Sequence, residues 1–226
     1  LKYFEDDPMT KAIVMYVEGM REGRSFLQQA YQTTRKKPIV LLKSGRSVTG
    51  MRSAGSHTGA LAGISEVSRT AFKRAGIITI DNLDELFPVT ETLSELPPID
   101  RNRVAILADG GGHATVAADM LSDYGIEMPQ LNEKTQRKLA EILPPNASLK
   151  NPVDVAGGTD ENPSLFADCA KIILNDTSID GLLIVGLFGG YSIRFADKLR
   201  FMEEDAAHRM GKLVKKIEKP IVLQSL

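Results

Sequence analysis

The sequence predicts an α/β protein with two domains, each built on a parallel sheet flanked by helices. Short, uniformly apolar runs of strand length alternate with segments of helical spacing along the whole chain. This alternation restarts after a proline-containing stretch near residue 97. Strands that are apolar on both faces are typical of parallel sheets covered by helices on each side.

The first half contains three predicted strands and three predicted helices. The strands are the apolar runs Lys11–Val17, Pro38–Leu42 and Ile77–Ile80. The helices, set by apolar spacing, are Arg21–Arg35, Thr58–Ala75 and Leu83–Leu93. A loop rich in glycine and serine, Ser44–Ser56, leaves the second strand.

The segment Glu95–Asn102 (ELPPIDRN) is the predicted domain boundary. Its two adjacent prolines stop a helix, and its charges suit an exposed connection. We expect domains at residues 1–97 and 98–226, the second of them truncated. Because the last predicted element is a strand with no helix after it, we expect the chain to be a piece of a longer polypeptide.

The second half repeats the alternation with one more strand and one more helix. Its strands are the apolar runs Val104–Ala108, Val153–Val155, Gly181–Leu187 and Pro220–Leu223. Its helices are His113–Tyr124, Asn132–Leu143, Pro163–Leu174 and Arg194–Ile217. We expect Asn132 to cap its helix, and the last helix to break near Gly211.

Composition excludes several classes of function. The 226 residues are 42% hydrophobic and 25% charged with a net charge of -1, so a basic surface for nucleic acid or anionic membranes is not expected. No apolar run is long enough to span a bilayer. The N-terminal segment Leu1–Asp7 is acidic, whereas a signal peptide begins with basic residues. The single cysteine, Cys169, excludes an internal disulfide, and three scattered histidines argue against a metal site. We expect a cytoplasmic protein.

The loop Ser44–Gly63 (SGRSVTGMRSAGSHTGALAG) is the first candidate site. It follows a buried strand and opens a helix near Thr58, which places His57 at a helix N-terminus where phosphate is favoured. Ser56, Thr58 and Gly59 are the expected phosphate-binding neighbours of this histidine. On these residues alone, a histidine that only caps its own helix has equal weight.

Three glycine-rich turns follow strands of the second half. Gly110, Gly111 and Gly112, with His113, follow the first of these strands; Asn151–Gly158 and Phe188–Gly190 follow later ones. Since parallel strands end at one edge, these turns are expected to converge on a ligand or another backbone. Each turn taken singly is at least as consistent with an ordinary connection.

Glu18 comes directly after the first strand, in the segment YVEGMREGR. A carboxylate at a strand end can orient a histidine or accept its proton. Without further information, an exposed loop residue is the favoured interpretation of Glu18.

Together and in this order, these segments resemble the ADP-forming acetyl-CoA synthetases and their relatives in the succinyl-CoA synthetase superfamily. The family loop SGRS-x-x-G-x-x-A-x-SHTGALAG matches Ser44–Gly63 nearly residue for residue. The resemblance implies two flavodoxin-like domains, His57 as a phosphohistidine and Glu18 as the residue that holds it. It also implies that the second-half turns are landmarks of the following ligase domain, with Gly110–His113 near the phosphate.

For the whole enzyme, the resemblance implies the reaction acyl-CoA + ADP + phosphate ⇌ carboxylic acid + CoA + ATP, through an acyl phosphate and a phosphohistidine. CoA and magnesium-bound ADP or ATP are then substrates, and no tightly bound cofactor is expected. Their binding is expected mainly in a CoA-binding domain and an ATP-grasp domain, which this sequence lacks. These domains or subunits are the expected partners, in an oligomer, and the chain alone is expected to be inactive.

The sequence departs from the family pattern in two ways, and two other functions are compatible with it. Family members often carry a small residue where this chain has His113, and the first part of the histidine-bearing domain is not visible. The chain can instead be the degenerate ligase region of a regulatory or protein-acetylating relative, or a non-catalytic assembly module. The intact SHTGALAG loop and Glu18 argue against both.

Overall fold

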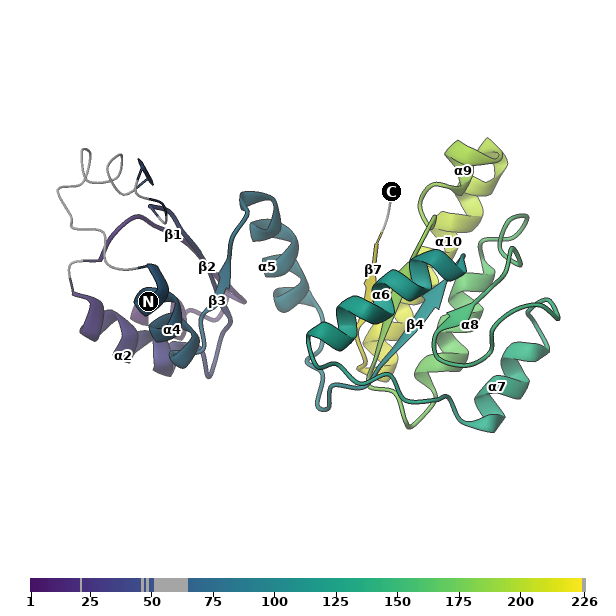
Figure 1. The fold of residues 1–226 in the computed structure, drawn as a ribbon, viewed down its shortest axis with the longest axis horizontal. Coiled ribbons are helices and arrows are strands. Elements are labelled where there is room, and N and C mark those ends of the chain that lie inside the picture. The colour runs from purple at the N-terminus through teal and green to yellow at the C-terminus, as the bar shows by residue number, and fades with distance from the viewer. Residues whose placement is uncertain (21, 46, 48, 51–64, 225–226) are drawn as a thin grey trace. The chain divides into compact units, whose positions relative to one another are not determined.

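The structure is a computed structural model that describes residues 1–20, 22–45, 47, 49–50 and 65–224. Contacts between Cα atoms divide the chain into two compact units, Leu1–Glu95 and Leu96–Leu226, shown in Figure 1. Each unit contains a parallel sheet flanked by helices, so the predicted α/β class is confirmed. None of the helices among the described residues combines the length and the hydrophobicity that a membrane-spanning segment needs.

The first unit has a three-stranded sheet in the order β1-β2-β3. Its strands are β1 (Ile13–Val17), β2 (Ile39–Lys43) and β3 (Ile78–Ile80). Its described helices are α1 (Lys2–Asp6), α2 (Gly23–Thr33), α4 (Ser65–Arg74), the short η1 (Leu83–Glu85) and α5 (Leu86–Glu95).

Alternate residues of β2 face opposite sides of this sheet and explain its two layers. Ile39 and Leu41 pack with Ala30 of α2 and Phe72 of α4. Val40 packs on the other face with Leu86 of α5. The central strand is therefore buried on both sides, as its uniformly apolar sequence predicts.

The second unit has a four-stranded parallel sheet in the order β5-β4-β6-β7. Its strands are β4 (Val104–Ala108), β5 (Val153–Asp154), β6 (Gly181–Val185) and β7 (Ile221–Leu223). Its helices are α6 (Gly111–Asp123), α7 (Glu133–Ala140), α8 (Leu165–Leu174), α9 (Tyr191–Arg194), η2 (Asp197–Leu199) and α10 (Arg200–Ile217).

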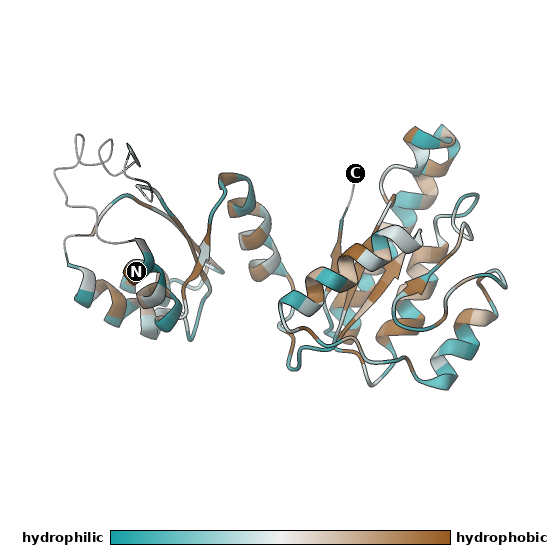
Figure 2. Cartoon of the chain, in the orientation of Figure 1, coloured by the Kyte–Doolittle hydropathy of each residue, from teal (hydrophilic) through white to brown (hydrophobic). Residues whose placement is uncertain are grey.

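β4 is buried along its whole length, and Figure 2 shows the apolar strands of this sheet in brown. Leu107 faces the larger core, which α8 and α10 contribute to. Ile106 faces the other side, where Ala114 and Ala117 of α6 pack. This arrangement fixes the start of α6 at the carboxyl end of β4.

The last predicted helix differs from the structure at both of its expected features. Instead of one segment from Arg194, the chain forms α9, then η2, and α10 begins at Arg200. α10 continues through Gly211 without a break. Its buried residues Glu203, Ala206 and Met210 recur at helical spacing, and this packing outweighs the low helix propensity of one glycine.

Asn132 stands at the N-cap position of α7, but its side chain does not cap that helix. It donates a hydrogen bond of 2.6 Å from Nδ2 to Asp176, which also accepts the backbone N–H of Asn132 at 2.8 Å. Burial raises the pKa of Asp176, but the hydrogen bonds from Ser178 and its other donors outweigh this and lower it. Asn132 therefore joins the start of α7 to the segment after α8.

Candidate functional site

The carboxyl ends of β1 and β2 bring Glu18 to the base of the loop Ser44–Gly63, which we call the histidine loop. The backbone N–H of Ser44 donates to the carbonyl of Val17 at 3.1 Å, which extends the pairing of the two strands. Lys43 Nζ donates to the carbonyl oxygens of Glu18 and Ser44, both at 2.6 Å. The lysine thus ties together the two segments that leave this edge of the sheet.

The carboxylate of Glu18 is half-buried and accepts a hydrogen bond of 3.3 Å from the hydroxyl of Tyr16. Desolvation lowers the pKa of Lys43, and the negative charge of Glu18 opposes part of that shift. A hollow of about 640 Å³ opens at the same edge, lined by Lys43, Ser44, Gly45 and other residues. Glu18 therefore stands beside the place where the loop begins.

The central residues of the loop lie outside the described residues. These are His57, Ser56, Thr58 and Gly59. The described chain reaches Gly50 on one side and continues from α4 on the other. The geometry between His57 and Glu18 is accordingly an expectation from the sequence.

Asp109, the residue directly after β4, is the centre of the second unit's edge. Its side chain is 6% exposed. Oδ2 accepts the backbone N–H of Leu187 at 2.8 Å and the hydroxyl of Tyr191 at 2.9 Å. Oδ1 is buried and is the one such described side-chain atom without a hydrogen-bond partner. Nδ1 of His113 lies 3.5 Å from Oδ1.

Gly186 has no side chain, and the carboxylate of Asp109 occupies the space where one would lie. A Cβ atom at position 186 would lie 1.8 Å from Asp109 Oδ1, and the residue has φ +122°. Both the missing side chain and the left-handed backbone therefore require glycine here.

The glycine turn after Asp109 starts α6. Gly110 is the N-cap residue and makes no side-chain cap, while Gly111, Gly112 and His113 form the first turn of the helix. Asp109, Gly110, Gly112 and His113 line one hollow of about 780 Å³ along α6. His113 is 61% exposed. The structure thus brings three of the predicted residues, Gly110, Gly112 and His113, to one surface with Asp109 and with the first backbone N–H groups of a helix.

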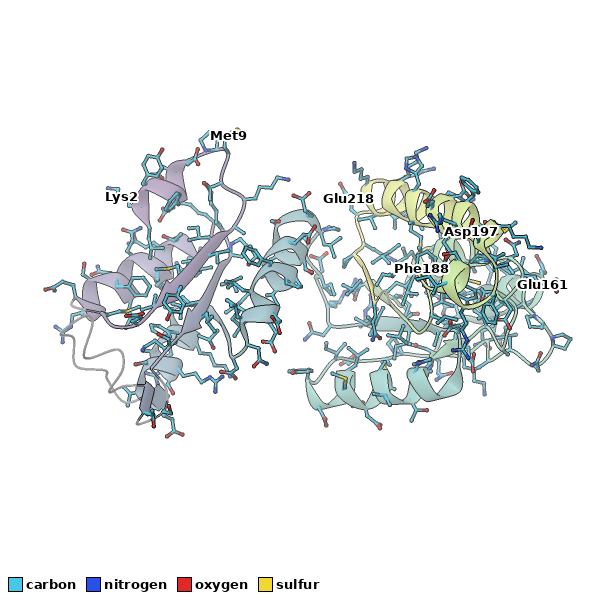
Figure 3. The ribbon with its side chains drawn as sticks, turned by 90° about the horizontal axis from the view of Figure 1, so that it is seen from above. Lys2, Met9, Glu161, Phe188, Asp197 and Glu218 are labelled. Carbon is cyan, nitrogen blue, oxygen red and sulfur yellow. The ribbon has the colours of Figure 1, made fainter. Side chains whose placement is uncertain are left out.

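The turn after β6 is held by a buried carboxylate from α10. Phe188, labelled in Figure 3, belongs to this turn. Glu203 is 6% exposed and accepts the backbone N–H groups of Gly189 at 2.7 Å, Tyr191 at 3.1 Å and Ser192 at 3.1 Å. Three charge-assisted hydrogen bonds therefore fix the backbone that carries Tyr191.

Tyr191 connects this turn with the other two glycine-rich segments. Its ring is buried, and its hydroxyl lies 2.6 Å from Thr159 Oγ1, next to Gly158 in the segment that follows β5. Burial raises the pKa of Tyr191, so its hydroxyl stays protonated and donates to Asp109. The three turns, expected to converge, are joined by one buried network of Thr159, Tyr191 and Asp109.

Asn151 serves the sheet rather than this edge. Its Oδ1 accepts the N–H of Ile106 at 3.0 Å, and its Nδ2 donates to the carbonyls of Val104 at 2.9 Å and Pro129 at 3.0 Å. Sequence reasoning also missed Glu203, Tyr191 and the placement of Asp109. The only local sign of this network in the sequence was Asp109, the aspartate before the glycine run, because the residues that contact Asp109 lie far away in the sequence.

Comparisons with known proteins assign both halves of the chain. Residues 1–93 match the family model described as succinyl-CoA ligase like flavodoxin domain, and residues 104–226 match the Ligase-CoA domain. The α subunit of ADP-forming acetate–CoA ligase II from Pyrococcus furiosus is 37% identical over 186 residues, 82% of this chain and 40% of the relative. The ADP-forming acetate–CoA ligase of Methanocaldococcus jannaschii is 42% identical over 157 residues, 70% of this chain and 22% of the relative.

A solved structure shows the same fold over nearly the whole chain. It is dinucleotide forming acetyl-coenzyme A synthetase 1 of Ca. Korarchaeum cryptofilum, in complex with phosphate and ADP, with a TM-score of 0.84 and 27% identity. The match covers 99% of this chain and 47% of that one, so this chain spans less than half the length of these relatives. The Ligase-CoA domain model matches more than half of the residues of this chain. The chain therefore belongs to the succinyl-CoA ligase-like family.

Proposed function

We propose that this chain is the phosphohistidine-carrying part of an NDP-forming acyl-CoA synthetase. The reaction is acyl-CoA + ADP + phosphate ⇌ carboxylic acid + CoA + ATP, and it proceeds through an acyl phosphate and a phosphohistidine. Residues 1–97 form the end of the histidine-bearing domain, and residues 98–226 form the second ligase domain. CoA and the magnesium-bound nucleotide are substrates held mainly by CoA-binding and ATP-grasp parts of the same cytoplasmic, oligomeric enzyme.

The observation that carries the proposal is the position of Glu18 at the base of the histidine loop. Its backbone oxygen and that of Ser44 share the ammonium group of Lys43. A carboxylate beside an imidazole fixes the tautomer and orientation of the ring, as carboxylates do for metal-bound histidines. We therefore assign Glu18 to hold the non-reacting ring nitrogen of His57.

The chemistry begins when inorganic phosphate attacks the thioester and displaces CoA, which leaves an acyl phosphate. The neutral imidazole of His57 then takes the phosphoryl group and releases the carboxylic acid, and the phosphohistidine passes the group to ADP. This covalent route divides one difficult transfer into two easier ones. Ser56, Thr58 and Gly59, with Gly110–His113 at the start of α6, supply hydrogen bonds to the phosphoryl oxygens.

The test is phosphate transfer to His57 in the complete enzyme with its ATP-grasp part. Radiolabelled ATP and magnesium should give a label that is stable to base and labile to acid, and His57→Ala should abolish it. Thr49→Ala, at a described residue of the same loop that has no assigned role, is the matched control and should keep the label. Equal labelling of wild type and His57→Ala would refute the mechanism and favour a regulatory relative or an assembly module.

A further inference from the structure

We propose that His113 is a second phosphoryl-accepting histidine, oriented by Asp109, that takes the group on Nε2 from donors of the phosphoramidate class. This goes beyond the proposed function, in which only His57 carries phosphate. A phosphohistidine is itself a phosphoramidate, so the physiological donor rests on that function. The reactivity of His113 toward phosphoramidates does not depend on the proposed function.

First, the carboxylate of Asp109 is held in place through one oxygen, and its other oxygen has no hydrogen-bond donor. Leu187 and Tyr191 both donate to Oδ2, and no hydrogen bond reaches the buried Oδ1. A buried carboxylate oxygen without a donor is costly, so a donor that can reach it is stabilised there. His113 Nδ1, 3.5 Å from Oδ1, is placed to become that donor.

The second support is the state in which this contact leaves the ring. When Nδ1–H points to Asp109, the lone pair of the neutral imidazole is on Nε2, on the opposite side of the ring. The side chain is 61% exposed, so Nε2 is open to a donor from solution. Asp109 thereby selects both the tautomer and the nitrogen that reacts.

The third support is the surrounding start of α6, a helix of 13 residues. The first N–H groups of an α-helix have no partner within the helix, and they favour phosphate. Gly110 provides no side-chain cap, and a Cβ at Gly112 would meet nothing within 4 Å, so the backbone is accessible to phosphoryl oxygens.

The transfer needs only the phosphoramidate donor and water. The lone pair of Nε2 attacks phosphorus and forms a P–N bond, while the P–N bond to the donor breaks. The leaving nitrogen takes the electron pair and a proton from water. The positive charge that develops on the ring is shared with Asp109 through Nδ1–H.

His208 is an internal control on the same unit. It is exposed on α10, and within the described part of the chain no hydrogen bond or ion pair joins its side chain to another residue. A reagent that phosphorylates any exposed imidazole should therefore modify both histidines alike and on both ring nitrogens.

The experiment treats the protein carrying His57→Ala with potassium phosphoramidate. Phosphorus NMR and mass spectrometry follow each site. We expect His113 to react about tenfold faster than His208, the scale on which an orienting carboxylate acts, and to give only the Nε2 isomer. Asp109→Asn should bring His113 close to the rate and isomer mixture of His208, and His113→Gln should remove its signal.

Equal rates and mixed isomers at His113 and His208 in the His57→Ala protein would overturn the inference, even if Asp109→Asn fails to fold. This result is independent of the labelling of His57 by ATP. A protein that fails the ATP test but shows fast Nε2 labelling of His113 refutes the proposed function alone. One that passes the ATP test with equal rates at His113 and His208 refutes only this inference.

Discussion

The carboxyl edges of the two sheets are built in different ways. In residues 1–95 the described edge is held by Lys43, a half-buried lysine that donates to two backbone oxygens near Glu18. In residues 96–226 the edge is held by buried side chains, with Asp109 and Glu203 accepting from backbone and hydroxyl donors. The second edge is therefore preorganised by its own core, whereas the first depends on solvent-accessible contacts.

Substitutions at the second edge should therefore cost far more folding free energy than those at the first. Urea unfolding gives the total effect. Hydrogen exchange followed by mass spectrometry then assigns the effect to residues 1–95 or 96–226.

Gly186→Ala should have the largest effect. Its Cβ would lie 1.8 Å from Asp109 Oδ1 at φ +122°. Overpacking and left-handed backbone strain together should lower the free energy of unfolding by about 3–5 kcal/mol. The loss should show as faster exchange in residues 96–226.

Gly211→Ala is the matched control for this prediction. No atom lies within 4 Å of its added Cβ, and it stands inside α10. Helix propensity should make it about 0.5–1 kcal/mol more stable. Similar losses at both glycines would mean that Asp109 does not require the space at Gly186.

Glu203→Ala should cost about 3 kcal/mol, because it leaves three backbone N–H groups of the Phe188 turn without their charged acceptor. Exchange should increase first at residues 187–192. Glu204→Ala, at the exposed neighbour on the same helix, should change stability by less than about 0.5 kcal/mol. An equally small effect at Glu203 would show that water satisfies the turn.

The sheets were predictable from sequence because burial leaves a local signature. β4 was predicted with the bounds that it has, Val104–Ala108, since every residue of the strand is buried and apolar. The network at its end was not predictable. Glu203 stands in the charged run Glu203–Glu204–Asp205 and looks like a solvated helix face, although one carboxylate is buried.

Long-range partners explain most of what the sequence did not reveal. Asp109 meets Leu187 and Tyr191 across 78 and 82 residues, and no local pattern encodes such pairings. The continuous α10 was missed for a related reason, because tertiary packing of Met210 outweighs the propensity of Gly211. Glycine positions, by contrast, marked the strand ends correctly, since tight turns need them.

Tyr191→Phe should cost about 1–3 kcal/mol by removing the donor to Asp109 and leaving the buried hydroxyl of Thr159 without its partner. Tyr124→Phe, at the C-cap residue of α6, which is 79% exposed, should be neutral. If the two variants are equally stable, the hydroxyl network at the second edge contributes nothing, and the contrast between the edges weakens.

Lys43→Met should cost less, about 1 kcal/mol at neutral pH, because water can replace the two hydrogen bonds of a half-buried ammonium group. Lys73→Met, at an exposed residue of α4, is the control.

The pH dependence separates Lys43 from that control. Desolvation lowers its pKa in the folded protein below the ordinary 10.5, so the unfolded state binds more protons just below pH 10.5. The stability of the wild type should therefore rise with pH as the folded lysine deprotonates, up to about that value. Desolvation also lowers the pKa of Lys219, so Lys43→Met should reduce this rise without abolishing it, whereas Lys73→Met should keep all of it. A rise of undiminished size in Lys43→Met would assign it to Lys219 or another group.

Glu18→Gln should have the smallest effect on folding and a large one on chemistry. The carboxylate is half-buried and accepts one long hydrogen bond from Tyr16, so the free energy of unfolding should change by less than about 0.5 kcal/mol. Labelling of His57 by ATP should nevertheless fall about 10- to 100-fold, the usual effect of removing a carboxylate that orients a histidine. Glu22→Gln, a nearby carboxylate just before α2, should leave labelling intact. Loss of stability together with labelling would make Glu18 a structural residue of the first edge, and this edge would then resemble the second.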